Sequence, residues 1–281
     1  MRIVAVIQAR MGSTRLPGKI VADIAGRPLV LWTVAAVRSV AGVDELVVAT
    51  TDQPEDDPFA ELLVRHGIRV HRGSARDVLG RVIGAVAPLS PDIVLRQTGD
   101  NPFPDPDIMA AQLRMVADGR ADYVGIAGLP LGIGAEAVRM SALETAGREA
   151  TETADREHVL PFVYARPERF AIGSLADPPA WRHHRYTVDT AADLAFARSL
   201  AGRLPAGDRP PRLADLEAIV AADPGLATVN RSIEQRGHHE AEPAMEPVVE
   251  PAEEPVERAK PVDADGPANA EPVGRIRTVE G

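Results

Sequence analysis

The chain opens with an apolar segment that runs directly into a loop rich in glycine and positive charge. Residues 3–7 read Ile-Val-Ala-Val-Ile, and residues 8–19 follow as Gln-Ala-Arg-Met-Gly-Ser-Thr-Arg-Leu-Pro-Gly-Lys. A short continuous apolar run of this kind is typical of a strand buried on both faces, as in a parallel sheet. In open α/β sheets, ligands bind at the carboxyl ends of such strands, where this loop begins. The segment therefore favours an α/β fold with a ligand site at its first loop.

The residue types of this loop suit a polyphosphate ligand. Gly12 and Gly18 allow the backbone to approach a phosphate closely, because glycine has no Cβ. Arg10, Arg15 and Lys19 supply positive charge to offset that of the phosphates. A solvated basic loop is the alternative, but glycine-containing phosphate loops recur in this strand–loop context. The spacing differs from that of the P-loop and of the dinucleotide-binding glycine motif, so neither of these is predicted.

Predicted strands and helices alternate through the first half of the chain. Strands are expected at residues 2–7, 45–50, 68–71 and 92–97, and helices at 28–40, 57–65, 75–86 and 107–116. This alternation predicts a mostly parallel sheet with helices on both faces. In the second half, strands are expected at 123–127, 135–139, 169–174 and 183–188, and helices at 141–149, 155–164, 190–203 and 212–222. We interpret this half as an α+β extension over the ligand edge of the sheet.

The composition narrows the functional class. A formal net charge of −10 is unlike that of a protein that grips a nucleic-acid backbone, so no nucleic-acid partner is expected. The sequence has no cysteine, which excludes disulfides and thiolate metal sites and fits a reducing compartment. It also lacks a run of about 18 apolar residues and a signal-peptide pattern, so we expect a cytoplasmic protein without a membrane span.

The end of the chain differs from the rest in charge and composition. Residues 240–281 hold eleven acidic and four basic residues, repeat Glu-Pro pairs and contain no aromatic residue. Such a segment cannot bury enough apolar area to offset the entropy of ordering its backbone. We therefore predict a folded domain over residues 1–235 and a disordered acidic tail over residues 236–281.

Two carboxylates are placed where predicted strands end. Asp100 follows the strand at 92–97, and Asp189 follows the strand at 183–188. Mg²⁺ in phosphate sites usually takes one or two carboxylates together with phosphate oxygens. Neither residue has a basic neighbour in the sequence, so two converging carboxylates would repel each other unless a cation lay between them. We predict that they share one Mg²⁺; the alternatives are a turn cap for Asp100 and a helix cap for Asp189.

A second polar segment follows the third predicted strand. Arg72, Gly73 and Asp77 could hold a nucleotide base or ribose at the ligand edge of the sheet. The alternative is a helix capped at Ser74 that leaves these charges exposed to solvent.

A third polar segment, Asp155-Arg156-Glu157-His158, begins a predicted helix in the second half. Glu157 and His158 could recognise an anionic, polyhydroxylated acceptor. A solvated first helical turn is the alternative.

Taken in this order, the segments resemble the cytidylyltransferase family that includes 3-deoxy-manno-octulosonate and acylneuraminate cytidylyltransferases. Within that family the chain is most similar to the spore coat polysaccharide biosynthesis branch. The resemblance covers roughly residues 1–230. The matching segments are residues 8–19, 48–51, 73–79 with Arg81, 98–102, 155–159 and 187–190.

The resemblance implies a Rossmann-like nucleotide-diphospho-sugar transferase fold for a nucleotidyltransferase domain, and transfer of CMP from CTP to a small anionic sugar-like acceptor. It also implies release of pyrophosphate, Mg²⁺ held by Asp100 and Asp189, and a homodimer as one arrangement. The implied catalytic residues are Arg15, Lys19 and Asp100. The implied nucleotide-binding residues are Ala9, Arg10, Gly12, Ser13, Arg15, Lys19, Arg72, Gly73 and Asp77. The implied acceptor-binding residues are Glu136, Arg156, Glu157 and His158.

One motif departs from the pattern of the branch. A Gly-x-Asp-x-Glu pattern is common there, but residues 132–136 read Gly-Ile-Gly-Ala-Glu, so Gly134 replaces the aspartate. The change permits a different acceptor or reduced activity. Three alternatives stay open: a sugar-1-phosphate nucleotidyltransferase, a glycosyltransferase on the same fold, and a catalytically silent nucleotide-binding module whose tail recruits a partner.

Overall fold

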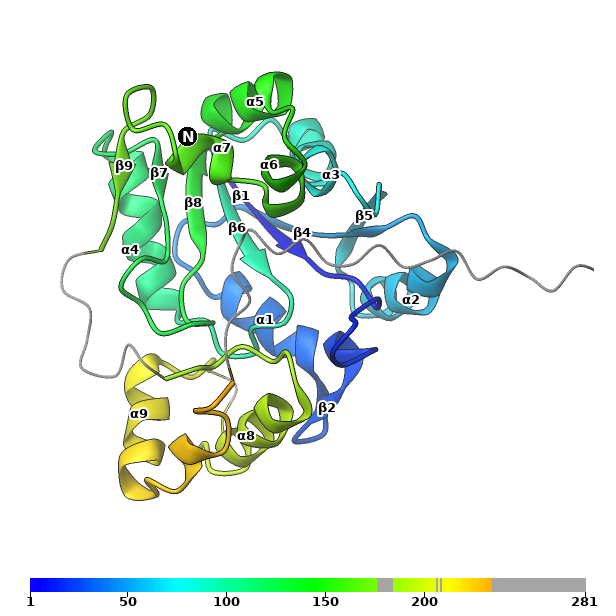
Figure 1. Cartoon of the computed structure of the whole chain (residues 1–281), viewed down its shortest axis with the longest axis vertical. Coiled ribbons are helices and arrows are strands. Elements are labelled where there is room, and N and C mark those ends of the chain that lie inside the picture. The colour runs from blue at the N-terminus through cyan, green and yellow to red at the C-terminus, as the bar shows by residue number, and fades with distance from the viewer. Residues whose placement is uncertain (176–183, 206, 208, 234–281) are drawn as a thin grey trace, which may run out of the picture. The chain divides into compact units, whose positions relative to one another are not determined.

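Four strands from the first half of the chain form the parallel part of a seven-stranded sheet. They are β1 (Ile3–Gln8), β4 (Glu45–Thr51), β5 (Arg69–Gly73) and β6 (Ile93–Thr98). Strand β1 pairs in parallel with both β4 and β6, and β5 pairs in parallel with β4. In the computed structural model (Figure 1), the strand order is β5-β4-β1-β6-β8-β7-β9. The predicted α/β class with a mostly parallel sheet is thus confirmed.

The structure describes residues 1–175, 184–205, 207 and 209–233. The predicted tail, residues 236–281, lies outside the described residues, so its disorder stays a prediction. None of the described helices is long and apolar enough to cross a membrane.

Strands from the second half extend the same sheet beyond β6. They are β7 (Tyr123–Val124), β8 (Glu136–Arg139) and β9 (Ile172–Gly173). Strand β8 runs antiparallel to β6 and β7, and β9 pairs in parallel with β7. A separate two-stranded hairpin, β2 (Asp23–Ile24) with β3 (Arg27–Pro28), was not expected from the sequence.

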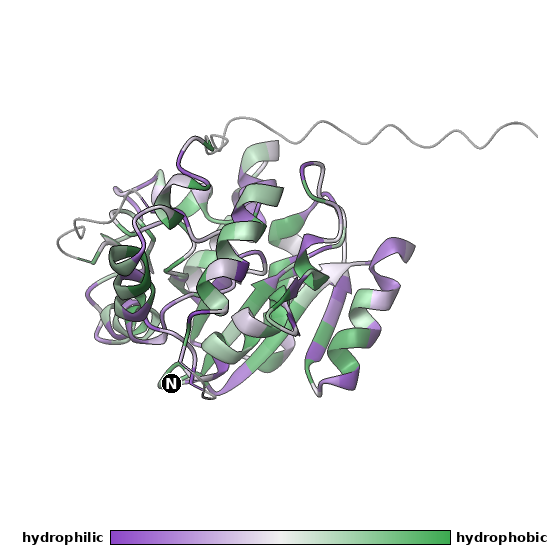
Figure 2. Ribbon diagram, turned by 90° about the horizontal axis from the view of Figure 1, so that it is seen from below, coloured by the Kyte–Doolittle hydropathy of each residue, from purple (hydrophilic) through white to green (hydrophobic). Residues whose placement is uncertain are grey.

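Helices cover both faces of the sheet, because alternate residues of the strands are buried on opposite faces. On one face, Ile3, Ala5 and Ile7 of β1 belong to a core cluster with the helices α1 (Leu29–Arg38), α2 (Asp57–Arg65) and α4 (Pro106–Ala117). On the other, Val4 and Val6 pack in a cluster with α3 (Val78–Val86), α5 (Met140–Glu149) and α7 (Pro161–Tyr164). In Figure 2 the strands are largely hydrophobic, and the helices carry hydrophilic residues among their hydrophobic ones.

A third core cluster forms at the carboxyl end of β6. It joins Phe103 and Ile133 to Tyr186 and Val188, with the helices α8 (Ala191–Ala201) and α9 (Leu213–Ala222) packed around them. The backbone N–H of Val188 donates to the carbonyl of Asp100 at 2.9 Å. The second half therefore reaches the ligand edge of the sheet. Short helices complete the described fold: α6 (Thr153–His158), η1 (Lys19–Val21), η2 (Pro54–Asp56), η3 (Ala87–Leu89) and η4 (Leu226–Thr228).

Three predicted elements differ in the structure. The helix expected at 155–164 is two helices, α6 and α7, because Val159 has a positive φ of 78° and Pro161 has no N–H to continue the first. The helix expected at 75–86 begins at Val78, and its N-cap is Asp77, whose carboxylate accepts from the N–H of Gly80. The helix cap proposed at Ser74 was therefore wrong.

The strand expected at 183–188 is also absent within its described part, residues 184–188. This segment is extended but makes a single bridge, between Arg185 and Leu131. Its alternating side chains pack against α8 and α9 instead of a neighbouring strand. Asp189 still follows an extended segment, as the sequence suggested, although that segment is not a strand of the sheet.

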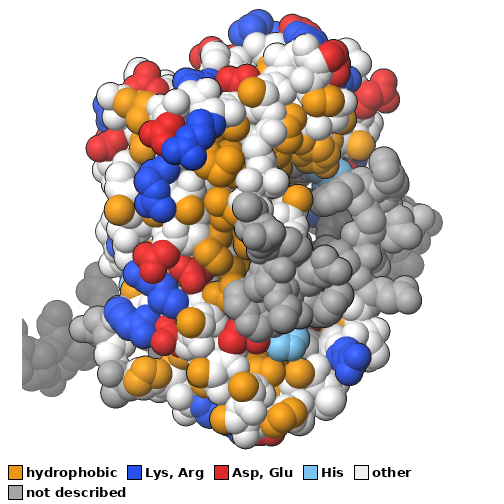
Figure 3. All heavy atoms as spheres, turned by 90° about the vertical axis from the view of Figure 1, so that its left-hand side faces the viewer, with side chains coloured by type: hydrophobic (Ala, Val, Ile, Leu, Met, Phe, Trp, Pro, Cys, Tyr) orange, Lys and Arg blue, Asp and Glu red, His pale blue; other side chains and the backbone are white. Residues whose placement is uncertain are grey.

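Apolar side chains are exposed on the face that lies on the left of Figure 1. In Figure 3, which views this face, they form a strip beside patches of acidic and basic side chains. Ile172 of β9 is 39% exposed. Edge strands that are this short pair poorly with other chains, which limits aggregation.

Candidate active site

The glycine-rich loop after β1 is closed on itself and fixed at its base. The N–H of Gly18 donates to the carbonyl of Met11 at 3.1 Å, and Gly18 adopts a φ of +70°, which favours glycine. The N–H of Met11 in turn donates to the carboxylate of Asp56 at 2.6 Å. Gly12 and Ser13 lie between these two anchors and are half-buried.

Asp56 was not identified from the sequence, yet it holds the loop against β4. Its side chain is fully buried and accepts hydrogen bonds from Thr50 Oγ1 at 2.9 Å, from the N–H of Thr51 at 3.0 Å and from Thr51 Oγ1. These donors satisfy the hydrogen-bonding capacity of the buried carboxylate. In the sequence it stands beside Glu55 and Asp57, so it reads as part of a solvated acidic turn.

Lys19, at the end of the loop, lies between the two predicted metal ligands. Its Nζ is 2.8 Å from Asp100 Oδ2 and 2.8 Å from Asp189 Oδ1. The structure thus brings together the two carboxylates that the sequence predicted to converge. The expectation that they would repel each other without a metal ion was wrong, because Lys19 already lies between them.

Asp189 carries two further cations. Arg15 contacts Asp189 Oδ1 at 3.1 Å, and Arg185, four residues before Asp189, contacts Oδ2. The helix-capping alternative for Asp189 was wrong, because Thr190 caps α8 in a capping box with Asp193. Asp189 is therefore free of a structural capping role and faces the loop.

Asp193 holds both Arg185 and the backbone of Asp189 in place. Its buried carboxylate accepts from Arg185 Nε at 2.9 Å, from the N–H of Asp189 at 3.0 Å and from Asn230 Nδ2 at 3.0 Å. Asp193 and Arg185 thus fix the position of Asp189, a role that nothing in the sequence separated from helix capping.

The electrostatics around Lys19 and Asp100 keep these two groups ionised. Burial lowers the pKa of Lys19, but Asp100 and Asp189 more than offset this, so its pKa is raised. Burial raises the pKa of Asp100, but the charge of Lys19 and hydrogen bonds from Lys19 and Thr98 outweigh it, so its pKa is lowered. Both shifts favour the charged pair.

The donor set at Asp100 and Asp189 fits a hard divalent cation that also takes phosphate oxygens. Two carboxylates converge on one point, and an ammonium now occupies the position that a metal ion would share. Among the described residues, no group of three or more His, Asp or Glu side chains could hold a metal alone. Phosphate oxygens or water molecules would therefore supply the remaining ligands, as is usual for Mg²⁺.

The predicted acceptor residue Glu136 is already paired. One carboxylate oxygen accepts from Tyr123 Oη at 2.6 Å and the other is bound by Arg96. Arg96 Nε also donates to Gln8 at the end of β1 at 2.9 Å. Burial raises the pKa of the Tyr123 phenol, and the charge of Glu136 adds to the effect, so Tyr123 stays a donor.

The predicted residues Arg156 and Asp77 bind each other. Arg156 Nε and Nη2 lie 3.0 and 2.6 Å from the two carboxylate oxygens of Asp77. Arg156 Nη1 also donates to the carbonyls of Gly147 and Ala150. Arg156 therefore ties α6 to the start of α3 and to the end of α5, and the structure does not place it with the loop cations.

Arg72 and Gly73 lie beside the end of β4. Arg72 donates to the carbonyls of Thr51 and Gln53, both at 2.9 Å, and contacts Asp57 at 2.6 Å. A Cβ on Gly73 would come within 3.2 Å of Arg81 Cγ. The proposed contacts of these residues with a nucleotide stay predictions, as do those of Ala9 and Arg10. The proposed contacts of Glu157 and His158 with the acceptor also stay predictions.

Arg81 is a buried cation that the sequence did not single out as a site residue. It is 4% exposed, and one of its terminal nitrogens donates to the carbonyl of Ser74. Its Nε has no hydrogen-bond partner among the described residues. Burial, followed by the charge of Arg10, lowers its pKa to about 10.

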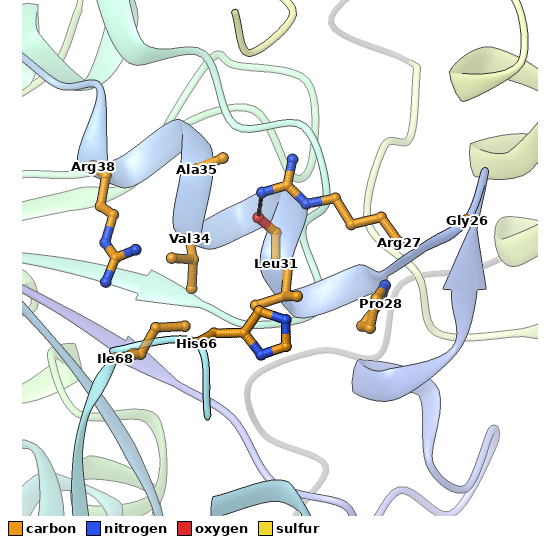
Figure 4. Close-up of a pocket in the computed structure, with 9 residues that line it drawn as sticks. All are labelled: Gly26, Arg27, Pro28, Leu31, Val34, Ala35, Arg38, His66 and Ile68. Carbon is orange, nitrogen blue, oxygen red and sulfur yellow. Dashed lines mark hydrogen bonds between the residues drawn. The ribbon is translucent and has the colours of Figure 1, made fainter. Parts of the chain in front are cut away.

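A hollow of about 460 Å³ in the described surface runs along α1, with Arg27 and Arg38 at its ends and His66 beside it (Figure 4). None of the predicted site residues lines it. It therefore has no part in the chemistry of the loop.

Comparisons with known proteins agree on one family. A cytidylyltransferase family model matches residues 4–210. The chain is 35% identical to the spore coat polysaccharide biosynthesis protein SpsF of Bacillus subtilis, over 80% of this chain and 97% of that protein. It is 27% identical to a cytidylyltransferase of known structure from Leptospira borgpetersenii, with a TM-score of 0.76 over 84% of this chain and 100% of that one. A CMP:2-keto-3-deoxy-manno-octonic acid synthetase solved with CTP shares the fold at 21% identity, with a TM-score of 0.56 over 72% of this chain and 99% of that one.

Proposed function

The chain belongs to the cytidylyltransferase family, and from that premise we propose that it transfers CMP from CTP to a hydroxyl group of a small anionic, sugar-like acceptor and releases pyrophosphate. The observation that carries the proposal is the convergence of Lys19, Asp100 and Asp189 at the end of the glycine-rich loop. The name of the Bacillus subtilis relative supports a role in the synthesis of surface polysaccharide or glycoconjugate precursors.

In this reaction an acceptor oxygen attacks the α-phosphorus of CTP in line. The bond from the α-phosphorus to the oxygen that bridges to the β-phosphate breaks, and pyrophosphate leaves with that electron pair. Arg15 and Lys19 hold the leaving phosphates, and His158 is the candidate to receive the hydroxyl proton. Catalysis of this kind comes mainly from positioning and electrostatic stabilisation.

We propose Mg²⁺ as the cofactor, held by Asp100 and Asp189. When bound, it would neutralise charge that develops on the phosphate oxygens. Two converging carboxylates beside a phosphate-type loop support this choice, because Mg²⁺ prefers hard oxygen ligands.

Neighbouring side chains crowd the position that a Cβ on Gly134 would take, and this supports a variant acceptor. A Cβ at this position would lie 2.5 Å from Leu129 Cδ1 and 3.3 Å from Ile126 Cγ2. A side chain at 134 would therefore require Leu129 to move. We propose that the acceptor of this chain makes an apolar contact here, where relatives of the branch would offer a carboxylate.

Release of pyrophosphate tests the function. The purified chain should release pyrophosphate from CTP faster than from ATP, GTP or UTP when sugar acids are supplied with Mg²⁺, and Asp100→Asn should not. A glycosyltransferase would give no pyrophosphate, and a sugar-1-phosphate nucleotidyltransferase would require a phosphorylated sugar. CTP binding without turnover on any acceptor would favour a silent binding module.

Two finer points remain proposals. A cytoplasmic location fits the absence of cysteine in the sequence, and cell fractionation would test it. The homodimer is tested by sedimentation velocity of the full chain.

A further inference from the structure

The cation between Asp100 and Asp189 is of a rare type in this chain. Of the 31 lysine and arginine residues in the sequence, only Lys19 and Lys260 are lysines. An ammonium is a compact charge on a flexible stem, whereas a guanidinium is a planar fork. Lys19 can therefore contact two carboxylates from one point, and it can leave them by rotation of its side chain.

The charges of the cluster balance without a metal ion. Three carboxylates face three cations, and the groups are Asp100, Asp189, Asp193, Lys19, Arg15 and Arg185. The side chains of Asp100 and Asp189 are 24% and 10% exposed. In the absence of nucleotide, the negative charges of both carboxylates are therefore balanced by cations of the chain. A divalent cation must then displace the ammonium of Lys19 to bind them.

The cations of the cluster are anchored differently. Arg185 is 8% exposed and bound to Asp193 as well as to Asp189 Oδ2. Lys19 and Arg15 come from the loop and both contact Asp189 Oδ1. If the loop cations turn to phosphates, Oδ1 of Asp189 and Oδ2 of Asp100 become available while Arg185 keeps Asp189 in place.

We propose that Lys19 and Arg15 exchange the two carboxylates for the phosphates of an incoming nucleoside triphosphate, and that this exchange opens Asp100 and Asp189 to a divalent cation. The inference rests on the proposed function. Nucleotide and metal then bind with positive coupling, and each increases the affinity for the other by the same factor. Without nucleotide, Lys19 holds the carboxylates together in the place of the metal.

The two lysines make the exchange directly observable. In protein labelled with ¹³C-lysine, NMR should show one Lys19 side-chain signal, assigned by its loss in Lys19→Arg, and one Lys260 signal as an internal control. Addition of Mg²⁺ alone should leave the Lys19 signal in place, and addition of Mg²⁺ with CTP should shift it. An equal shift with Mg²⁺ alone would overturn the proposal, as would bound CTP that leaves Lys19 unmoved.

A second measurement needs no nucleotide. Binding of Mn²⁺, followed by electron paramagnetic resonance, should be at least about tenfold tighter in Lys19→Met than in the wild type, a difference of about 1.4 kcal/mol. Arg38→Met is the control, because it removes the same charge from a residue that donates to the carbonyl of Gly67 on the α1 side.

Failure of the inference is distinguishable from failure of the proposed function. If calorimetry shows that no nucleoside triphosphate binds, the proposed function fails, but the Mn²⁺ comparison still decides whether Lys19 blocks the carboxylates. Equal Mn²⁺ affinity in the wild type and Lys19→Met overturns the inference, whatever the substrate.

Discussion

The end of the glycine-rich loop and the surroundings of Glu136 both pair acidic with basic side chains, but the two sets are bonded differently. At the loop, Lys19 bridges two carboxylates from segments far apart in the sequence, and Asp189 Oδ1 is shared by Lys19 and Arg15. On the other side, Glu136 is enclosed by Arg96 and Tyr123. The first set can be rearranged by a polyanion, whereas the second is complete within the protein.

This difference shows what separates a binding cluster from a supporting one. Cations on a loop that share one acceptor can transfer to a ligand, because another cation remains to compensate the acceptor. A pair closed by strands and a buried tyrosine leaves a partner uncompensated if either member turns away, which costs free energy. The predictions below test whether this contrast holds.

The largest effect is expected at the two shared carboxylates. Asp100→Asn and Asp189→Asn should each lower kcat by at least about a thousandfold, and the double variant should be little worse, because groups that act as a unit are non-additive. Pyrophosphate release in the presence of Mg²⁺ measures this. Independent, multiplying losses would show that the two carboxylates do not act on one metal ion.

The support beneath Asp189 should matter next. Asp193→Asn should lower the free energy of unfolding by about 2 to 4 kcal/mol, because it leaves Arg185 less compensated in a buried site. Burial raises the pKa of Asp193, but Arg185 and the hydrogen bonds outweigh it, so its pKa lies below 3.8. Because the pKa is lower in the folded state, ionised Asp193 stabilises the fold at pH values above its pKa in the unfolded chain. This stabilisation is lost as the pH falls through the pKa of the folded state.

Chemical denaturation at several pH values checks this sign. Wild type and Asp193→Asn should differ most above pH 3.8 and converge at lower pH. A difference that grows towards acid pH would mean that Asp193 is not held as an anion.

The loop cations should affect triphosphates specifically. Arg15→Ala and Lys19→Ala should each weaken CTP binding by about 10- to 150-fold, since a charge-assisted contact contributes about 1.5 to 3 kcal/mol. Cytidine binding should change little, and calorimetry can compare the two ligands. Equal losses for CTP and cytidine would show that the loop does not contact phosphates.

The smallest effect on activity is expected at Glu136. Glu136→Gln should lower the free energy of unfolding by about 1 to 2 kcal/mol, because Arg96 loses a charged partner. Its KM for CTP and for the acceptor should stay within about threefold, since a closed pair binds no ligand. A tenfold rise in the acceptor KM with unchanged stability would confirm Glu136 as an acceptor residue and end the contrast.

The sequence predicted those parts of the site that depend on local pattern. The apolar run before the loop located β1, and residues that follow extended segments located Asp100 and Asp189. The bridge by Lys19 was not predicted, because its two partners are far from it in the sequence. Asp100 is 81 positions away and Asp189 is 170 positions away. Asp56 was missed because its local partners, Thr50 and Thr51, carry no distinctive pattern, and because its bond to the loop joins it to Met11, 45 positions away in the sequence.

The predicted elements were wrong where the periodicity of apolar residues was given more weight than local features. Pro161 was visible in the sequence and marks the break between α6 and α7, but the apolar spacing favoured one helix. The segment at 184–188 has the alternation of a strand, yet its apolar residues are buried by α8 and α9 and not by sheet neighbours. Alternation reports burial on one side and does not identify what covers it.

A crystal structure of the chain with CTP and Mn²⁺, using anomalous scattering to locate the metal, tests the central claim most directly. We predict Mn²⁺ bound by both Asp100 and Asp189 beside the α-phosphate, with metal–oxygen distances of about 2.1 to 2.2 Å, as for a hard divalent ion. Lys19 and Arg15 should then lie on the phosphates. CTP bound with Lys19 still between the two carboxylates and no metal on either would contradict the account.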